Sequence, residues 1–273
     1  MEKYYDITVD WSGKKYIGIS LKWDYTNRTL ETSVPGFVKK LLHRLQHPTP
    51  SKPQHAPAKA VPINYGAKHQ EAIPEDTTPQ LSEEGIRRIQ RAVGTFAWYS
   101  RATDLIMAKT LSSIAGRQVK ATEKLKEELN QFLDYCSTHP DERVRYVASD
   151  MILALHSDAS HLSEPQSKSR AAGHFYLTNN NHKDMNNGAI LTLSKIIKHV
   201  VRSASEAEVA ALFYNCKAAI PLRIALMEMG HPQPKTPAVT DNTTAEGLMN
   251  DTMTSNKSKH YDLRFNWLKC REA

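Results

Sequence analysis

Cysteine is scarce in this chain. The three cysteines, Cys136, Cys216 and Cys270, are far apart and odd in number, and no Cys-x-x-Cys pair occurs. This pattern argues against a disulfide framework and against a zinc site. We therefore expect the protein to work in a reducing compartment.

Long apolar runs and targeting segments are also missing. No uninterrupted apolar stretch approaches the roughly 18 residues that a membrane span needs, so we expect no membrane partner. The first six residues, Met-Glu-Lys-Tyr-Tyr-Asp, lack the apolar core of a signal peptide. A cytoplasmic or nuclear location, or both in turn, is expected, and no address signal decides between them.

The bulk composition is that of an ordinary globular protein. The chain has 273 residues and a mass of 30.8 kDa, enough for one large domain or, as we expect, two modest ones. The hydrophobic share of 40% and the charged share of 24% are also ordinary. A net charge of +7 mildly favours a polyanionic partner, although many basic proteins bind no nucleic acid.

The residue pattern of the first half of the chain changes three times. A β-hairpin is expected over 5–9 and 15–21, and a third strand over 29–33, because β-branched and aromatic residues flank turn signals there. Apolar residues then recur at helical spacing over 37–45. A Pro-rich segment over 47–78 shows neither period and is expected to be an extended linker. Amphipathic patterns predict further helices over 82–97, 105–115 and 121–136.

The second half reads as a mixed α/β fold. Strands are expected over 144–148, 151–157, 173–178 and 189–196, with an Asn-Asn-Gly turn before the last. A helix over 203–220, a short strand over 238–240 and helices over 242–249 and 260–272 follow. Antiparallel strands, then a helix, then another strand predict a mixed sheet with flanking helices.

Three acids stand at the ends of elements in this half. Asp158 follows the apolar run 152–155 and shares a strand face with His156 under the two-residue alternation. It is either an acid at the rim of the sheet or a turn-forming Asp before Ala-Ser. Asp241 closes the short strand, where it can cap the next helix, ligate a metal, or do both.

The third acid comes from the first turn of the helix over 203–220. Acids in a first turn also serve capping and the helix dipole, a role that suits Glu206 well. Residues two apart lie about 200° apart around a helix, so only one of Glu206 and Glu208 can face the sheet. We prefer Glu208, which stacks with Ala211, Leu212 and Asn215.

Five motifs together resemble the ribonuclease H domain of copia-type retrotransposon Pol polyproteins. They are His-Ser-Asp-Ala-Ser at 156–160, Ser-Lys-Ser-Arg-Ala-Ala-Gly at 167–173, Ser-Ala-Ser-Glu-Ala-Glu at 203–208, Thr-Asp-Asn at 240–242 and Lys-His-Tyr-Asp at 259–262. Upstream, 14–19, 92–96 and 101–104 resemble the part of that polyprotein that links the reverse transcriptase palm to ribonuclease H. The resemblance covers nearly the whole chain.

This resemblance implies a division of the chain. Residues 1–46 would be the end of the reverse transcriptase palm or connection, and 47–81 a Pro-rich linker. A helical thumb or connection subdomain would follow over 82–142, and a ribonuclease H-like domain over 143–273, truncated at its C-terminus.

The resemblance also implies a site and its chemistry. Asp158, Glu208 and Asp241 would hold two Mg²⁺ ions, with Mn²⁺ as a possible substitute, and hydrolyse the RNA strand of an RNA–DNA hybrid. Asp262 is a weaker fourth candidate ligand, the alternative being a surface acid. Basic residues near the site are candidate phosphate contacts: Lys168, Arg170, Lys195, Lys198 and Arg202.

Two departures from the family pattern leave activity open. The Tyr-x-Asp-Asp turn of the polymerase is missing, and the chain stops before the family's fifth strand and last helix, which carry the fourth carboxylate. The first hypothesis is therefore a ribonuclease H fragment that works beside the rest of a polyprotein. The alternative is an inactive remnant that binds nucleic acid, and a decayed chain that never folds disagrees with the intact apolar periodicity. The oligomeric state stays open.

Overall fold

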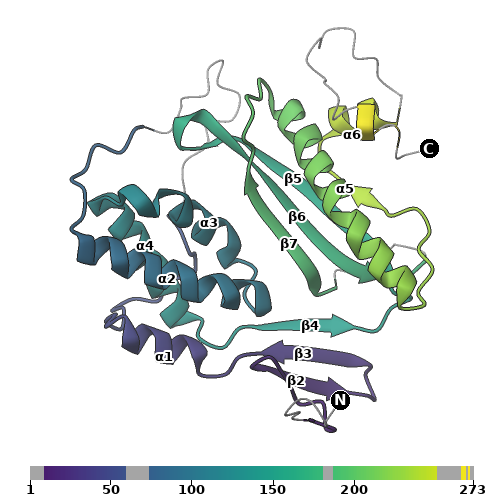
Figure 1. The fold of residues 1–273 in the computed structure, drawn as a ribbon, viewed down its shortest axis with the longest axis horizontal. Helices are drawn as coiled ribbons and strands as arrows, with labels where there is room; N and C mark the ends of the chain where they lie inside the picture. Colours follow the sequence, from purple (N-terminus) through teal and green to yellow (C-terminus); the bar gives the residue numbers. More distant parts are fainter. Residues whose placement is uncertain (1–8, 60–73, 181–186, 251–265, 269, 271–273) are drawn as a thin grey trace, which may run out of the picture.

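The protein consists of an antiparallel sheet, a group of helices and a mixed sheet with its own helices (Figure 1). These are the features of a computed structural model that describes residues 9–59, 74–180, 187–250, 266–268 and 270. A mixed α/β fold, as expected, is confirmed for this part of the chain.

The first sheet has the strand order β1-β2-β3-β4 and is antiparallel throughout. Its strands are β1 (Lys15–Tyr16), β2 (Ile19–Asp24), β3 (Thr29–Ser33) and β4 (Arg143–Val147). The expected single strand over 15–21 is wrong, because Ile17 and Gly18 have φ angles of 46° and 82° and form a two-residue hairpin turn. Of the partner strand expected over 5–9, residues 5–8 lie outside the described residues.

Strand β4 joins the two halves of the sequence. It pairs with β3, with Val144 opposite Thr32 and Val147 opposite Thr29. It also touches the second sheet, where the Asn187 amide bonds the backbone of Val147 and the Tyr146 hydroxyl donates to Ala189 O at 3.0 Å. The division at residue 143 stays a prediction, and β4 belongs to a sheet formed mainly by residues before it.

Four helices share one apolar core. They are α1 (Phe37–Arg44), α2 (Glu83–Ala102), α3 (Met107–Arg117) and α4 (Glu123–Thr138), and the short 3-10 helix η1 (Gln118–Lys120) links the last two. Phe96, Tyr99 and Phe132 are fully buried at its centre. Side-chain oxygens of Ser82 and Thr122 cap α2 and α4 by accepting from the backbone N–H three residues on.

The Pro-rich segment lies along this helical core. In its described parts, 47–59 and 74–78, it forms neither helix nor strand. His47 Nε2 lies 2.7 Å from Asp134 Oδ1, and Gln54 N–H donates to Thr138 Oγ1 at 2.9 Å. The expected lack of helix and strand is confirmed in these parts, whereas the linker role stays a prediction, and the segment is packed against α4 over part of its length.

The second sheet has the strand order β7-β6-β5-β8. Its strands are β5 (Ile152–Glu164), β6 (Lys168–Thr178), β7 (Ala189–Ile196) and β8 (Ala238–Val239), and a 3-10 turn, η2 (Pro165–Ser167), links the first two. The first three strands are antiparallel and β8 runs parallel to β5. The expected mixed sheet is thereby confirmed in the described residues.

Helix α5 (Ala204–Glu228) covers one face of this sheet (Figure 1). Its Ala219 and Leu226 pack against Leu153, Leu155 and Phe175. The helix approaches β6 so closely that a Cβ added to Gly173 would lie 2.2 Å from Asn215 Oδ1. A glycine is therefore required at this crossing.

Asn215 forms the polar part of that crossing. It is fully buried, and its amide donates to Ser157 Oγ at 2.9 Å and to Ala172 O at 2.8 Å. A buried amide whose donors are satisfied fixes the position of the helix along the strands.

Helix α5 is longer than the sequence predicted. We expected it to end before Pro221, because proline removes a backbone donor. The helix continues for two more turns, and Arg223 binds the carbonyls of Gln233 and Pro234 while Leu226 packs on the sheet. These tertiary contacts outweigh the local cost of the proline.

By length and composition alone, α5 could cross a membrane, and it is the one such helix in the described part of the chain. Core helices of soluble proteins pass the same test. The helix packs on the sheet through both apolar and polar side chains, as a core helix does.

Candidate metal centre

The parallel pairing of β5 and β8 places two acids side by side. Leu155 is opposite Ala238 and His156 is opposite Val239. Asp158 is two residues further along β5, and Asp241 is two residues beyond Val239, just past the end of β8, so the two acids are at neighbouring positions. We expected Asp158 to end its strand, and this expectation is wrong, because β5 continues to Glu164. β8 ends instead, and β5 runs on with one edge open.

Glu208 reaches this open edge from the first turns of α5. Its Oε1 accepts the N–H of Ala159 at 3.0 Å, and its Oε2 accepts from the Thr240 hydroxyl at 3.3 Å. The Leu155 N–H donates to the carbonyl of Pro237, just before β8, so Ala159, four residues on, directs its N–H to the same edge. The carboxylate of Glu208 thus takes the position that a longer β8 would occupy.

The neighbouring polar residues act as caps. Ser203 Oγ accepts the Glu206 N–H at 3.1 Å, and Glu206 Oε2 accepts the Arg202 N–H at 2.7 Å. This arrangement resembles a capping box, and it confirms that Glu208 faces the sheet while Glu206 does not. Asn242, rather than Asp241, caps α6 (Thr243–Met249) by accepting from the Ala245 N–H at 2.9 Å. Asp241 is left free for another role.

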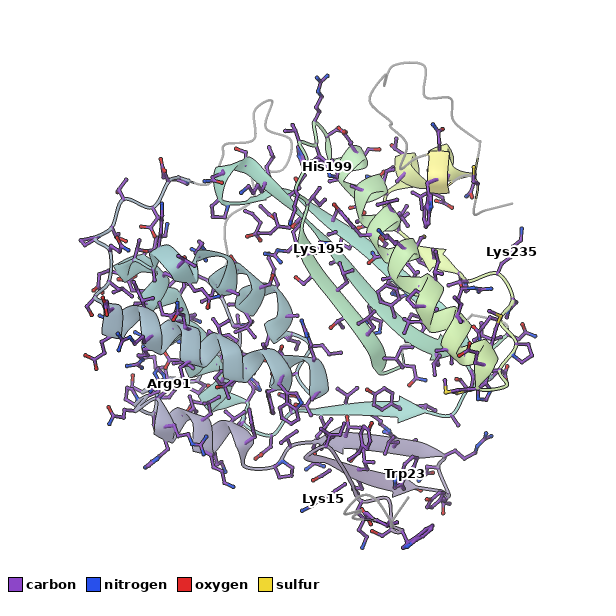
Figure 2. The ribbon with its side chains drawn as sticks, viewed as in Figure 1. Lys15, Trp23, Arg91, Lys195, His199 and Lys235 are labelled. Atoms are coloured by element: carbon purple, nitrogen blue, oxygen red, sulfur yellow. The ribbon has the colours of Figure 1, made fainter. Side chains whose placement is uncertain are left out.

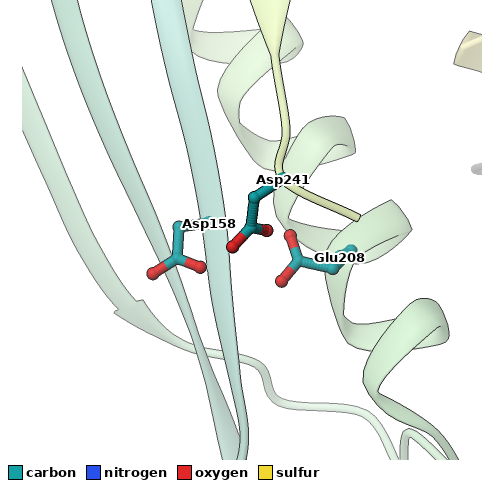
Figure 3. Close-up of side chains that lie close together, drawn as sticks. All are labelled: Asp158, Glu208 and Asp241. Atoms are coloured by element: carbon teal, nitrogen blue, oxygen red, sulfur yellow. The ribbon is translucent and has the colours of Figure 1, made fainter. Parts of the chain in front are cut away.

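The three carboxylates converge. One oxygen from each of Asp158, Glu208 and Asp241 lies within 4.8 Å of the others. Figure 3 shows the Asp241 carboxylate between the other two, with each acid coming from a different element. Glu208 is buried, and both aspartates are exposed, so the cluster opens to solvent on the side of the aspartates.

The electrostatics of the cluster favour a bound cation. Burial raises the pKa of Glu208 to about 7, and the charges of Asp158 and Asp241 add to that rise. Burial also raises the pKa of Asp158, with a further rise from Asp241, while the Lys109 ammonium opposes it. Like charges held this close repel one another, and a divalent ion would relieve that repulsion.

The donor set fits a hard divalent ion. Three carboxylates offer oxygens only, which suits Mg²⁺ or Mn²⁺ rather than zinc. Mg²⁺ binds its ligands at about 2.1 Å, so oxygens on one ion lie roughly 3–4 Å apart. Carboxylates within 4.8 Å of one another can hold one such ion, or share two, after small side-chain rotations.

Two of the basic residues that we predicted near the site are engaged elsewhere. Arg170 is buried and binds Glu164 at 2.7 Å, with Ser112 and Ser194 as further partners, so it is not available to a phosphate. Lys195, which Figure 2 labels, lies on the α5 face of the sheet, because it is opposite Ala171 in the row of Ala159, and its Nζ is 4.8 Å from the centre of the Tyr214 ring. Asp158 is on the opposite face, because it shares a cross-strand row with Ala172 and Ser194.

Three other basic residues are exposed. Lys168 starts β6 and binds Gln166, while Lys198 and Arg202 lie on the connection from β7 to α5. Phosphate contacts at these three positions stay predictions. The weaker candidate ligand Asp262 and the helix expected around it fall outside the described residues, apart from a short helical stretch that includes Trp267 and Leu268.

Sequence reasoning missed three participants in the site. The Ala159 N–H and the Thr240 hydroxyl hold Glu208, and Lys109 of α3 acts on Asp158 from a distant part of the chain. Thr240 could have been found from its position beside Asp241. Nothing in the sequence places Lys109 near Asp158.

The fold and the site define a class: a mixed α/β protein with a three-carboxylate cluster where β5, α5 and β8 meet. The chain is distantly similar in sequence to a copia-type retrotransposon polyprotein. It is 21% identical over 269 residues to the retrovirus-related Pol polyprotein from transposon TNT 1-94 of Nicotiana tabacum. The match covers 98% of the chain and 19% of that polyprotein, so the chain spans about a fifth of its relative. No family model and no solved structure matches the chain.

Proposed function

We propose that this chain is a ribonuclease H-type nuclease that hydrolyses the RNA strand of RNA–DNA hybrids with a divalent metal ion. The observation that carries the proposal is the convergence of Asp158, Glu208 and Asp241 on one point. The order of elements supports it, because three antiparallel strands, a helix and a strand parallel to the first supply the acids in turn. The relation to a retrotransposon Pol polyprotein and the net charge of +7 agree with a nucleic-acid substrate.

Each carboxylate has a distinct part in the proposed reaction. Asp158 and Asp241 are exposed and present oxygens to the solvent side, where a phosphodiester would arrive. Glu208 is held by Ala159 and Thr240, so its carboxylate is already oriented before an ion binds. The three carboxylates would hold Mg²⁺, which would supply an activated water and charge stabilisation for the leaving oxygen. The protein's own contribution is to hold three negative oxygens together against their repulsion.

The test is cleavage of a labelled RNA–DNA hybrid in Mg²⁺ and in Mn²⁺. The wild-type chain is expected to cut the RNA strand, and Asp158→Asn and Glu208→Gln are each expected to lower the rate at least 100-fold, because several kcal/mol of transition-state stabilisation is lost. Glu206→Gln is the matched control. It changes the same residue type one half-turn away and leaves a side chain that can still serve a capping box.

The outcomes separate two classes of function. Cleavage that Glu208→Gln abolishes and Glu206→Gln keeps supports the nuclease. Hybrid binding without cleavage in either metal ion would refute the enzyme for this chain and favour a non-catalytic nucleic-acid-binding protein. If Glu208→Gln and Glu206→Gln lost cleavage equally, the start of helix α5, rather than the carboxylate cluster, would be what cleavage requires.

A further inference from the structure

Helix α3 lies on the face of the second sheet that carries Asp158. Ser112 on α3 donates to Ser194 O at 3.4 Å and accepts from Arg170 Nη1 at 2.9 Å. Ser113 donates to Glu164 Oε2 at 3.3 Å. Helix α5 covers the other face, so the sheet lies between two helices that come from different parts of the sequence.

The register of the strands shows how near this contact is to the metal centre. Asp158 is opposite Ala172, and Ala172 is opposite Ser194. These three residues form one row across the sheet and point to one face. Neighbouring strands are about 4.8 Å apart, so the Ser112 contact at Ser194 is only about 10 Å along the row from Asp158.

Helical spacing places Lys109 on the same side of α3. Lys109, Ser112, Ser113 and Gly116 follow the three- and four-residue steps of one helix face. Ser112 and Ser113 bind the sheet, and a Cβ on Gly116 would meet Ile196 at 4.0 Å. Lys109 is one turn before them on the same helix face and is exposed.

Lys109 belongs to the helix face that docks on the sheet about 10 Å along the row from Asp158, and it is exposed. An exposed lysine at this place is able to meet a negative ligand that approaches the same carboxylates.

Polar contacts at both of its ends hold α3 in this place. Asp104 accepts the Ile106 N–H and the Tyr135 hydroxyl, each at 3.1 Å, and so ties the start of α3 to α4. At the other end, Arg117 binds Glu128. The helix that carries Lys109 is therefore fixed to the helical core as well as to the sheet.

We propose that Lys109 is a backbone-phosphate contact of the metal centre, supplied by the helical part of the chain to the strand that is cut. This inference rests on the proposed nuclease function and adds a substrate-binding residue to it. Three carboxylates repel a phosphodiester, and a lysine across from them gives that phosphate a cationic partner. The helical part would thereby form one wall of the substrate site.

The salt dependence of hybrid binding tests this inference. Binding is measured with the Asp158→Asn protein in Mg²⁺, which avoids cleavage, over a series of salt concentrations. Adding Lys109→Ala is expected to reduce the slope of log K against log [salt] by about one and to weaken binding several-fold at low salt. Adding Lys109→Arg, which keeps the charge, is expected to preserve the slope.

Lys120→Ala is the matched control. Lys120 is an exposed lysine about 16 Å further along the same helical stretch and is expected to leave the slope unchanged. With Asp158 intact, Lys109→Ala is also expected to raise KM more than it lowers kcat, as the loss of a ground-state contact does. A loss of folding, monitored by circular dichroism, would lower kcat without this split.

The failure of this inference can be told from the failure of the nuclease proposal. Suppose that the Asp158→Asn protein binds the hybrid and that Lys109→Ala and Lys120→Ala give the same slope of log K against log [salt]. Lys109 is then no phosphate contact, whereas the cleavage result stands. If Lys109→Arg reduced the slope of log K against log [salt] as much as Lys109→Ala does, a role of Lys109 based on its charge would be refuted. If the Asp158→Asn protein binds no hybrid at all, both proposals fall.

Discussion

The helical region and the second sheet are stabilised in different ways. The helices share one large apolar cluster, with Phe96, Tyr99 and Phe132 at its centre. Around the second sheet the apolar residues form three smaller clusters, in which alanine is frequent. Between those clusters the protein buries polar groups, including Asn215 and the Arg170–Glu164 pair.

This difference separates stability from chemistry. Large aromatic side chains stabilise a fold through the area they bury, without any requirement for a unique partner. Buried polar groups cost free energy unless each is satisfied, but they fix geometry closely. The second sheet carries the carboxylate cluster, and there the polar contacts set the positions of α5 and α3, the helices that carry Glu208 and Lys109.

The largest effect is expected from breaking the buried ion pair. Arg170→Ala would leave Glu164 as an uncompensated buried charge and lower the free energy of unfolding by about 3–5 kcal/mol. Urea denaturation measures this change. The double variant Arg170→Met with Glu164→Leu is expected to recover most of the loss, because no charge then remains buried. A cost below about 1 kcal/mol for Arg170→Ala would show that the pair is not buried in solution.

Two glycines compare the regions directly. Gly173→Ala places a Cβ 2.2 Å from Asn215 Oδ1, and Asn215 is held by two hydrogen bonds, so a loss of about 1–3 kcal/mol is expected. Gly94→Ala is the matched control in the helical region. No atom lies within 4 Å of its added Cβ, and the change is expected to stabilise α2 by about 0.5–1 kcal/mol.

Asn215→Ala tests whether the clash with Asn215 causes the loss of stability in Gly173→Ala. If the clash is the cause, Gly173→Ala will cost less in the Asn215→Ala background than in the wild type, a coupling that a double-mutant cycle measures. Additive effects would mean that the glycine serves the strand itself rather than the close helix.

Removal of the Glu208 charge is expected to stabilise the metal-free protein above pH 7. The folded pKa of Glu208, about 7, lies above the ordinary value of 4.5, so the folded state binds more protons than the unfolded state between these values. Stability is therefore lost as the pH rises through this window. Glu208→Gln avoids that loss, and we expect a gain of about 1–2 kcal/mol at pH 8 and little gain at pH 5.

Metal ions should reverse this order. Added Mg²⁺ binds the folded wild-type protein and raises its melting temperature, while Glu208→Gln lacks one ligand and is expected to respond weakly. If Glu208→Gln raised the free energy of unfolding by the same amount at pH 5 and at pH 8, this result would contradict the raised pKa of Glu208.

The smallest effect is expected at the surface of the helical region. Arg87 and Glu83 form an exposed pair at 2.8 Å on successive turns of α2. Arg87→Ala is expected to change the free energy of unfolding by less than about 0.5 kcal/mol, and less still at high salt. A larger loss would mean that surface charges matter more to the helical region than its apolar core suggests.

Much of the second sheet could be predicted because its signals are local. Strand β7 has the bounds expected from alternation and the Asn-Asn-Gly turn, and the 200° separation of Glu206 and Glu208 selected the acid that faces the sheet. The predictions that were wrong concern places where distant contacts override local rules. Helix α5 passes through Pro221, and β5 runs beyond Asp158 because β6 continues to pair with it.

The sequence by itself determined the identity of the three acids and the kind of element that carries each, because hydrophobic periodicity and capping act over a few residues. Only the tertiary structure decided that β8 ends beside Asp158, that Arg170 is buried with Glu164, and that Lys109 lies near the carboxylates. Those facts depend on strand register and on the docking of α3, which join β5 to β8 and to α3 although these segments are far apart in the sequence and share no local pattern.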